Sequence, residues 1–490
     1  MLTAFWGQAS SLHSVGGRAS SLHSVGGRAS SLHSVGGRAS SLHGRGQVPG
    51  SFDTPCDTAI LVAVIMNLNR RNFIKAAAAF PYVIRPSALG LCATTAPSNR
   101  IAVGCIGTGG KGTGDMNAFL QSPGVQVLAV CDVLTANRLK ARDIVNKRYG
   151  NTNCADYSDF RRIIDRRDID AVTIGTCDHW HAIPAVTAAA SGKDIFCQKP
   201  LAHNIAEGRA ICRAVEKYQV IFQTGSQQRS QKSFRRACEL VRNGRIGKVH
   251  TVEVGLPTRW VQTCGPQPTM PVPEGFDYDT WLGPAPWAPY TEKRCIPLGW
   301  RWNYDYASGI ITDWGAHHLD IAQWGMGTEH TGPVEIEPLE WLFPPDGLWN
   351  VAIRYNVRCR FAEGFTLVVA DTDKLRQGIR FIGGEGWVHI NRHRLSAEPL
   401  SVLKSAIKPS ETILYESDDH IGNFLDCVRS RCRTVAPAQV AHRSVAIGHL
   451  ATIAMKLGRK LRWDPAKERF LNDTEADRLI ARTTRIPWRL

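Results

Sequence analysis

A short apolar run that leads directly into a cluster of glycines constrains the fold of this chain more than any other feature. Residues 101–106 (IAVGCI) are apolar enough to form a buried parallel strand, and the stretch GTGGKG follows at once. Glycines permit a tight turn and let the backbone approach a pyrophosphate, which then lies at the N-terminus of the next helix. We therefore expect a dinucleotide-binding turn made by Gly107, Thr108, Gly109, Gly110 and Gly112.

A second apolar run, VQVLAVCDV, places an acid where such a turn needs one. Asp132 lies twenty residues beyond Gly112. A carboxylate there would accept hydrogen bonds from the adenosine ribose hydroxyls and repel a 2′-phosphate. The alternative is an aspartate that only caps a helix. The order of strand, glycines, helix, strand and acid favours NAD as cofactor, while Lys111 and Arg138 keep NADP open.

The pattern of strand and helix then repeats. Residues 169–176 (IDAVTIGT) read as a strand, 177–193 as a loop and an Ala-rich helix, and 194–198 (DIFCQ) as another buried strand. This alternation predicts a doubly wound parallel sheet whose ligand lies beyond the C-terminal ends of the strands. The side chains at such ends, which we expect on the nicotinamide side of the cleft, are Thr176, Asp178, His181 and Lys199.

Lys199 has a second feature that singles it out, because Pro200 follows it. Proline cannot continue a central ladder, and the residue before a proline is held extended. Lys199 is therefore expected to point from a strand end into the cleft. The alternative is a solvated turn residue.

From about residue 223 the periodicity changes to that of antiparallel strands. Residues 351–361 (VAIRYNVRCRF) alternate strictly between apolar and polar side chains. After a turn at Glu363-Gly364, residues 365–371 (FTLVVAD) are expected to pair with this stretch in an antiparallel hairpin, and residues 379–390 (IRFIGGEGWVHI) predict a second hairpin. A mixed or antiparallel sheet with one polar face, covered by helices on the other, fits an α+β partner domain.

Chain length supports this division into domains. A chain of 490 residues is too long for one core. The fold class is α/β, with an NAD-binding Rossmann domain at residues 98–222 and an α+β domain at 223–475, which is expected to supply the substrate site. Residues 476–490 are left as a tail.

The N-terminal region is expected to lie outside this fold. Residues 9–43 repeat ASSLHSVGGR at a period of ten, which is too polar to close a core, so we expect residues 1–65 to be disordered. A start codon assigned too far upstream of Met66 would explain the repeat. Residues 66–97 resemble a twin-arginine signal, because Arg70-Arg71 precedes an apolar stretch too short to span a bilayer. We expect export to the periplasm or cell envelope and no integral membrane span.

Charge and cysteine content exclude other classes. The formal charge of +16 invites a nucleic-acid partner, but the Lys and Arg residues are scattered, so we expect none. The fourteen cysteines form no CxxC pair and several lie in apolar runs, which is typical of buried thiols.

The stretch ASGIITDWGAHHLDIAQW carries candidate acid-base chemistry. If residues 313–324 are helical, Asp313 and His317 lie on one face, within reach of each other. A carboxylate against one ring nitrogen would fix the tautomer and leave the other nitrogen free to act as a base. One alternative is a metal cluster that adds His318 and Asp320, but a cofactor that carries the redox chemistry makes a metal unnecessary, and we predict none. Another is a helix histidine with no role.

Aromatic and polar residues near these motifs are candidates for the substrate. Aromatic faces beside donors and acceptors suit a sugar or cyclitol. The predicted substrate contacts are Gln228, Arg229, Trp302, Tyr304 and His318. The alternative for the aromatic residues is a place in the core.

The stretches GTGGKG, TCDHWHAIPAVTAAASGKDIFCQKPL, TGSQQRS and GIITDWGAHHLDIAQW resemble, in order and spacing, the Gfo/Idh/MocA family of NAD(P)-dependent oxidoreductases. The resemblance runs from about residue 99 to 475 and is strongest to an exported planctomycete-type branch. It implies that Lys199, Asp313 and His317 are catalytic, and that an open-faced, mostly antiparallel C-terminal sheet forms a dimer or tetramer. Gln198, placed against the cofactor, replaces the family's usual glutamate.

We therefore expect an NAD-dependent dehydrogenase that transfers a hydride between nicotinamide and a carbinol of a sugar, cyclitol or related polyol. One alternative is a glycoside hydrolase that uses tightly held NAD for transient oxidation and elimination. A non-catalytic sugar sensor is the other.

Overall fold

The computed structural model describes residues 99–258 and 263–490, which fall in the compact unit Val83–Leu490. The predicted low-complexity region (1–65) and leader (66–97) lie outside the described residues. No helix in the described part of the chain is long and apolar enough to cross a membrane.

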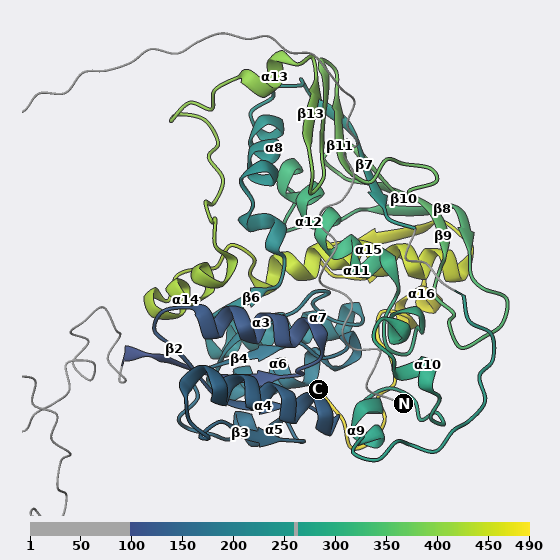
Figure 1. Cartoon of the computed structure of the whole chain (residues 1–490). Helices are drawn as coiled ribbons and strands as arrows, with labels where there is room; N and C mark the ends of the chain where they lie inside the picture. The colour runs from purple at the N-terminus through teal and green to yellow at the C-terminus, as the bar shows by residue number, and fades with distance from the viewer. Residues whose placement is uncertain (1–98, 259–262) are drawn as a thin grey trace, which may run out of the picture. The chain divides into compact units, whose positions relative to one another are not determined.

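Among these residues, six parallel strands form a sheet in the order β3-β2-β1-β4-β5-β6 (Figure 1). The strands are β1 (Ile101–Ile106), β2 (Val125–Cys131), β3 (Ala155–Tyr157), β4 (Ala171–Ile174), β5 (Asp194–Cys197) and β6 (Phe222–Thr224). The helices that alternate with them are α3 (Gly110–Gln121), α4 (Thr135–Tyr149), α5 (Arg161–Ile164), α6 (Ala182–Ala190) and α7 (Ile205–Tyr218). Strands β4 and β5 are buried along their whole length, as expected of strands covered on both faces. The predicted doubly wound parallel sheet is confirmed.

A helix from the distant C-terminal part of the chain completes the core of this sheet. Helix α14 (His420–Ser430) brings Phe424 against Phe119 of α3 and Phe196 of β5, with ring centroids 5.5 to 5.9 Å apart. Three mutually edge-packed rings bury a large apolar area. Part of the region assigned from sequence to the second domain thus packs on the first.

A second sheet of nine strands, in the same part of the chain, has the order β13-β12-β11-β7-β10-β9-β8-β14-β15. Only β7 and β10 pair in parallel, so the sheet is mostly antiparallel, as predicted. Its strands are β7 (Val249–Leu256), β8 (Glu335–Leu342), β9 (Arg354–Arg360), β10 (Thr366–Asp371), β11 (Gly378–Gly383), β12 (Gly386–Ile390), β13 (Leu395–Glu398), β14 (Leu461–Asp464) and β15 (Arg469–Phe470). The predicted pairings of β9 with β10 and of β11 with β12 are both present.

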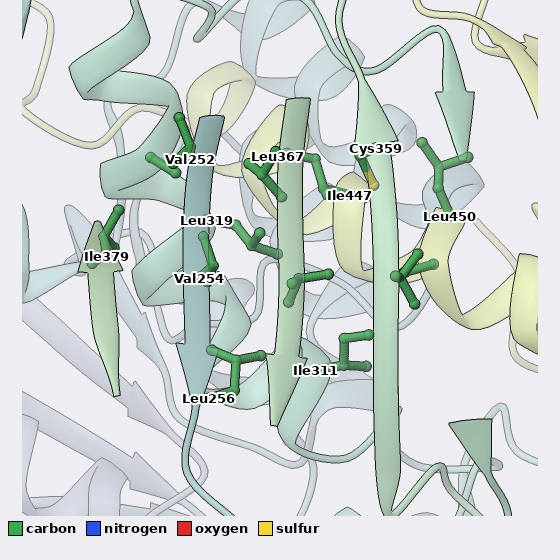
Figure 2. Close-up of a cluster of buried hydrophobic side chains, with 14 of the residues drawn as sticks. Val252, Val254, Leu256, Ile311, Leu319, Cys359, Leu367, Ile379, Ile447 and Leu450 are labelled. Carbon is green, nitrogen blue, oxygen red and sulfur yellow. The ribbon is translucent and has the colours of Figure 1, made fainter. Parts of the chain in front are cut away.

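Helices cover one face of the nine-stranded sheet, where the second core lies. Figure 2 shows side chains of β7, β9, β10 and β11 packed against Ile311, Leu319, Ile447 and Leu450. In β9 the alternation seen in the sequence is the burial pattern, because Tyr355, Val357 and Cys359 are buried while the three arginines of the strand, on the other face, are exposed. The remaining helices, including short 3₁₀ segments, are η3 (Asp178–Trp180), η4 (Gln227–Ser230), α8 (Lys232–Arg242), α9 (Tyr278–Leu282), α10 (Glu292–Cys295), η5 (Gly299–Trp302), α11 (Ile310–Asp313), α12 (Gly315–Met326), α13 (Ser401–Lys404), α15 (Ala438–Leu457) and α16 (Thr474–Arg478).

Candidate active site

The glycine turn between β1 and α3 has the geometry that a bound pyrophosphate needs. Gly107 has φ of +78°, and a Cβ on Gly112 would lie 1.8 Å from the Gly107 carbonyl oxygen, so neither position admits a side chain. Gly109 and Gly110 instead face open space, with no atom within 4 Å of a Cβ placed there. No side chain caps the N-terminus of α3. Its first N–H groups are therefore free to bind an anion.

Asp132, which follows β2, stabilises this turn through a hydrogen bond from its backbone. Its Oδ2 accepts a hydrogen bond from Thr108 N (2.8 Å) and its Oδ1 accepts one from Leu134 N (2.9 Å). Burial raises the pKa of Asp132, and these backbone donors oppose that shift. The carboxylate lies beside the turn, where the sequence places it, and it also has a structural role there.

The strand-end residues Thr176, Asp178 and His181 lie together after β4. The ring nitrogens of His181 lie 2.7 Å from Pro200 O and 3.2 Å from Thr176 O, so this side chain ties the ends of β4 and β5 together. Asp178 is buried, and burial raises its pKa to about 8, against the opposing pull of Arg301. The charges of Asp313 and Lys199 act on it as well. Asp178 is therefore close enough to Lys199 and Asp313 to interact with their charges.

Gln198, directly after β5, faces the carboxylate of Asp115. Its Nε2 donates to Asp115 Oδ2 at 2.6 Å, and Lys111 pairs with the other oxygen of Asp115. Burial raises the pKa of Asp115. The Oε1 atom of Gln198 is buried without a hydrogen-bond partner among the described residues. A neutral amide at position 198 therefore suits the acid across from it, whereas a glutamate would place two carboxylates in contact.

Lys199 and Asp313 form the centre of the site. Lys199 Nζ donates to Asp313 Oδ1 (2.6 Å) and to Asp313 O (3.1 Å). Arg301 Nε donates to the same Oδ1 at 3.3 Å. Burial alone would raise the pKa of Asp313, but the two cations outweigh it and hold the pKa below its usual range. Asp313 is ionised, and it links the end of β5 to α11.

His317 lies beside this ion pair without bonding to it. A tight turn at Trp314 separates α11 from α12, so residues 313–324 are not one continuous helix, and His317 N bonds to Trp314 O. Lys199 and Arg301 both bond to Oδ1 of Asp313, and His317 Nδ1 has no partner among the described residues. The expected hydrogen bond from His317 to Asp313 is not formed. Burial and the nearby Lys199 and Arg392 charges hold the pKa of His317 well below its usual range, so its ring is neutral.

Gln228 and Arg392 complete this side of the site. With its amide oriented so that both atoms are satisfied, Gln228 donates to His317 O and accepts from Arg392 Nε, each at 3.2 Å. The Arg392 guanidinium lies 4.4 Å from the centre of the Trp314 ring. Of the predicted substrate residues, Gln228 bonds to the backbone of His317 in α12.

The other predicted substrate residues have different surroundings. Arg229 is buried and its guanidinium binds Asp320 (2.6 and 2.9 Å) and Glu329 (2.8 Å), which leaves little donor capacity for a ligand. His318 is buried against the second sheet, 3.3 Å from Gly255 O, and burial lowers its pKa to about 3. Trp302 belongs to the second core and Tyr304 packs against it, with Lys456 over its ring. The aromatic residues thus follow the alternative stated for them, a place in the core.

The C-terminal segment holds the loop that contains Asp178. Arg482 donates to His179 O (2.7 Å), Asp305 O (3.2 Å) and Glu207 Oε1 (2.6 Å), and the ring of Trp488 lies 4.7 Å from that of Trp180. Residues assigned from sequence to a tail therefore support the site. Within residues 99–258 and 263–490, no group of three or more His, Cys, Asp or Glu side chains could hold a metal ion.

Sequence reasoning missed Arg301, Arg392, Trp314 and Asp115. Trp314 lies within the quoted stretch ASGIITDWGAHHLDIAQW and Arg301 precedes Trp302, so position in the sequence could have suggested both. Arg392 follows β12, far from any motif, and only the fold brings it to His317.

Two parts of the chain match descriptions of one family. Residues 101–226 match the "Oxidoreductase family, NAD-binding Rossmann fold", and residues 238–490 match the "Oxidoreductase family, C-terminal alpha/beta domain". The chain is 27% identical over 230 residues to levoglucosan dehydrogenase of Pseudarthrobacter phenanthrenivorans, covering 46% of this chain and 51% of the relative. It is 29% identical over 150 residues to inositol 2-dehydrogenase of Salmonella typhimurium, covering 30% and 43%. The chain spans about half the length of the curated relatives it matches.

Solved structures agree on the fold. The aldose-aldose oxidoreductase from Caulobacter crescentus has a TM-score of 0.54 and 22% identity, covering 74% of this chain and 99% of that one. The chain therefore belongs to the Gfo/Idh/MocA oxidoreductase family, with its NAD-binding Rossmann domain and its C-terminal α/β domain.

Proposed function

We propose that this protein is an NAD-dependent dehydrogenase that acts on a carbinol of a sugar, cyclitol or related polyol. The observation that carries the proposal is the Lys199–Asp313 ion pair (2.6 Å) with neutral His317 beside it, at the C-terminal end of β5. Ligands of open α/β sheets bind at this edge. The printed names of the relatives, levoglucosan dehydrogenase and inositol 2-dehydrogenase, support the substrate class.

The glycine turn fits NAD. The open space at Gly109 and Gly110 and the uncapped N-terminus of α3 suit its pyrophosphate, and Asp132 beside the turn suits a ribose without a 2′-phosphate. NAD, when bound, supplies the acceptor for the hydride that leaves the carbinol carbon with two electrons.

The protein groups handle the proton and the developing charge. As the hydride leaves, the hydroxyl proton passes to the ring of His317, which is neutral before the reaction. The Lys199 ammonium stabilises the negative charge that grows on the substrate oxygen. Asp313 holds Lys199 in place through the 2.6 Å contact. In reduction each step runs in reverse.

The test is NADH formation by purified protein across a panel of sugars, cyclitols and polyols, with His317→Asn as the variant. Removal of a general base lowers kcat by about 10² to 10⁴, while NAD affinity measured by calorimetry stays unchanged. Absence of NAD binding, or full activity in His317→Asn, would contradict the proposal. Release of an aglycone from a chromogenic glycoside without net NADH would favour the glycoside hydrolase instead.

Assembly and localisation are further parts of the proposal. We propose a homo-oligomer through the outer face of the nine-stranded sheet, which carries exposed ion pairs such as Arg358–Glu337 and Arg354–Asp373; sedimentation velocity tests it. We also propose twin-arginine export, tested by whether Arg70→Lys/Arg71→Lys stops export of a fused reporter.

A further inference from the structure

The candidate active site holds more positive than negative charge. Three cationic side chains, Lys199, Arg301 and Arg392, act on Asp313. Two of them already bond to its Oδ1. Asp178 is a second acid on which Arg301 and Lys199 act, and even when it is ionised the three cations exceed these two acids by one positive charge. The site is therefore built to receive an anion.

Of these three cations, Arg392 is the one for which no ion pair with a carboxylate is formed among the described residues. Its guanidinium lies 4.4 Å from the ring centre of Trp314, and its Nε donates to Gln228 (3.2 Å). Arg392 is exposed at one side of the site. Partial burial lowers its pKa, and the opposing charge comes from Asp313, which already bonds to Lys199 and Arg301. Stacking and the Nε bond fix the plane of the group. Neither contact uses the two terminal nitrogens of the guanidinium, which can therefore donate hydrogen bonds to a ligand.

Arg301 is arranged in the same way. Its Nε bonds to Asp313 (3.3 Å), and its guanidinium lies 4.7 Å from the ring centre of Trp300. Both arginines are thus stacked on a tryptophan and anchored through Nε. A planar fork held in this manner matches the two oxygens of a carboxylate.

The cofactor does not account for these cations. Its phosphates belong at the glycine turn, where the nearby lysine, Lys111, pairs with Asp115. Arg392 follows β12 of the second sheet and acts on His317, which is on the substrate side. The oxidised nicotinamide is itself cationic, so it would add to the excess of positive charge.

We propose that the substrate carries a carboxylate, so that the enzyme acts on a sugar acid of the uronate type in preference to the neutral sugar. Arg392 is the specificity-determining residue and Arg301 assists it. This inference rests on the proposed dehydrogenase function and narrows its substrate class.

The test compares matched pairs, glucuronate with glucose and galacturonate with galactose, together with glucose 6-phosphate, on the full NAD-loaded protein. We expect kcat/KM for a uronate to exceed that for its neutral partner at least about 10-fold. In Arg392→Met, kcat/KM for the uronate should fall about 10- to 100-fold, mainly through KM, as loss of a hydrogen-bonded charge partner implies. For the neutral sugar, kcat/KM should fall by a clearly smaller factor, because only the uronate loses a charge partner. Arg394→Met is the control and should leave both values unchanged, because Arg394 is a likewise exposed arginine two residues away, whereas Arg392 is the one stacked on Trp314.

Other results would overturn the inference in distinguishable ways. Preference for the neutral sugar, or an equal loss for both substrates in a folded Arg392→Met, contradicts it but leaves the dehydrogenase intact. Preference for the sugar phosphate contradicts the choice of a carboxylate. If no substrate turns over, calorimetry on the NAD-loaded protein decides, since uronate binding that is no tighter than that of the neutral sugar refutes the inference. Failure to bind NAD at all refutes the proposed function instead.

Discussion

The contact between Gln198 and Asp115 predicts a pH-dependent loss of stability in Gln198→Glu. The two side chains lie 2.6 Å apart and both are buried. In the variant, two carboxylates would share this space. Two unit charges about 4 Å apart repel by about 4 kcal/mol at an effective dielectric constant of about 20. Lys111 already pairs with Asp115 but is half-exposed, so it offsets only part of this repulsion.

The direction in which stability changes with pH depends on how many protons the two carboxyl groups bind in the folded and unfolded states. The repulsion raises the pKa of one carboxyl in the folded state above its unfolded value of about 4. A raised acid pKa leaves stability intact below the unfolded pKa and lowers it as pH rises towards the folded pKa. At pH 5, keeping one proton costs about 1 kcal/mol, whereas at pH 8 the loss reaches the full repulsion of about 4 kcal/mol.

The assay is urea denaturation of the wild type and of Gln198→Glu at pH 5 and pH 8. The double variant Asp115→Asn/Gln198→Glu is the matched control, and we expect it to recover most of the loss at pH 8, because it holds a single carboxylate. If Gln198→Glu is as stable as the wild type at pH 8, or loses the same amount at both pH values, the account of this pair is wrong.

Three further predictions concern the surroundings of the site. Burial raises the pKa of Asp178 to about 8, so wild-type stability should fall as pH rises from about 4 towards 8, and Asp178→Asn should flatten that slope in urea titrations; an unchanged slope would contradict it. Arg482→Met should destabilise the protein by about 3 kcal/mol, because Glu207 is left buried without its partner at 2.6 Å. Arg478→Met, at an exposed position, should have no effect, and equal melting temperatures for the two variants would refute the role given to Arg482. Gly112→Ala should prevent folding of the turn, since its Cβ would lie 1.8 Å from Gly107 O, while Gly109→Ala has open space and should fold but bind NAD more weakly by calorimetry; normal NAD binding by Gly112→Ala would count against the turn geometry.

The elements that could be predicted from sequence are those whose burial is periodic. Strands β1 and β5 are continuous apolar runs because both faces of the parallel sheet are covered, and β9 alternates because one face is exposed. The glycine turn was predictable as well, since Gly107 and Gly112 occupy backbone positions that other residues cannot.

What the sequence could not provide is pairing across long distances. The spacing of Asp313 and His317 indicates neighbours along a helix, but the carboxylate bonds instead to Lys199, 114 residues away. Electrostatics explains the choice, because a buried carboxylate is stabilised more by two cations than by a neutral imidazole. Arg392 and the packing of α14 on the parallel sheet depend in the same way on tertiary contacts.

In the proposed mechanism, Lys199 acts on the reacting oxygen of the substrate. The most direct measurement is a single-turnover experiment that follows NADH formation in wild type and Lys199→Met, both loaded with NAD and saturated with the best substrate of the panel. We predict the same NAD affinity in both proteins and a rate of hydride transfer at least about 100-fold lower in Lys199→Met. An undiminished rate in a folded, NAD-bound Lys199→Met would contradict the account.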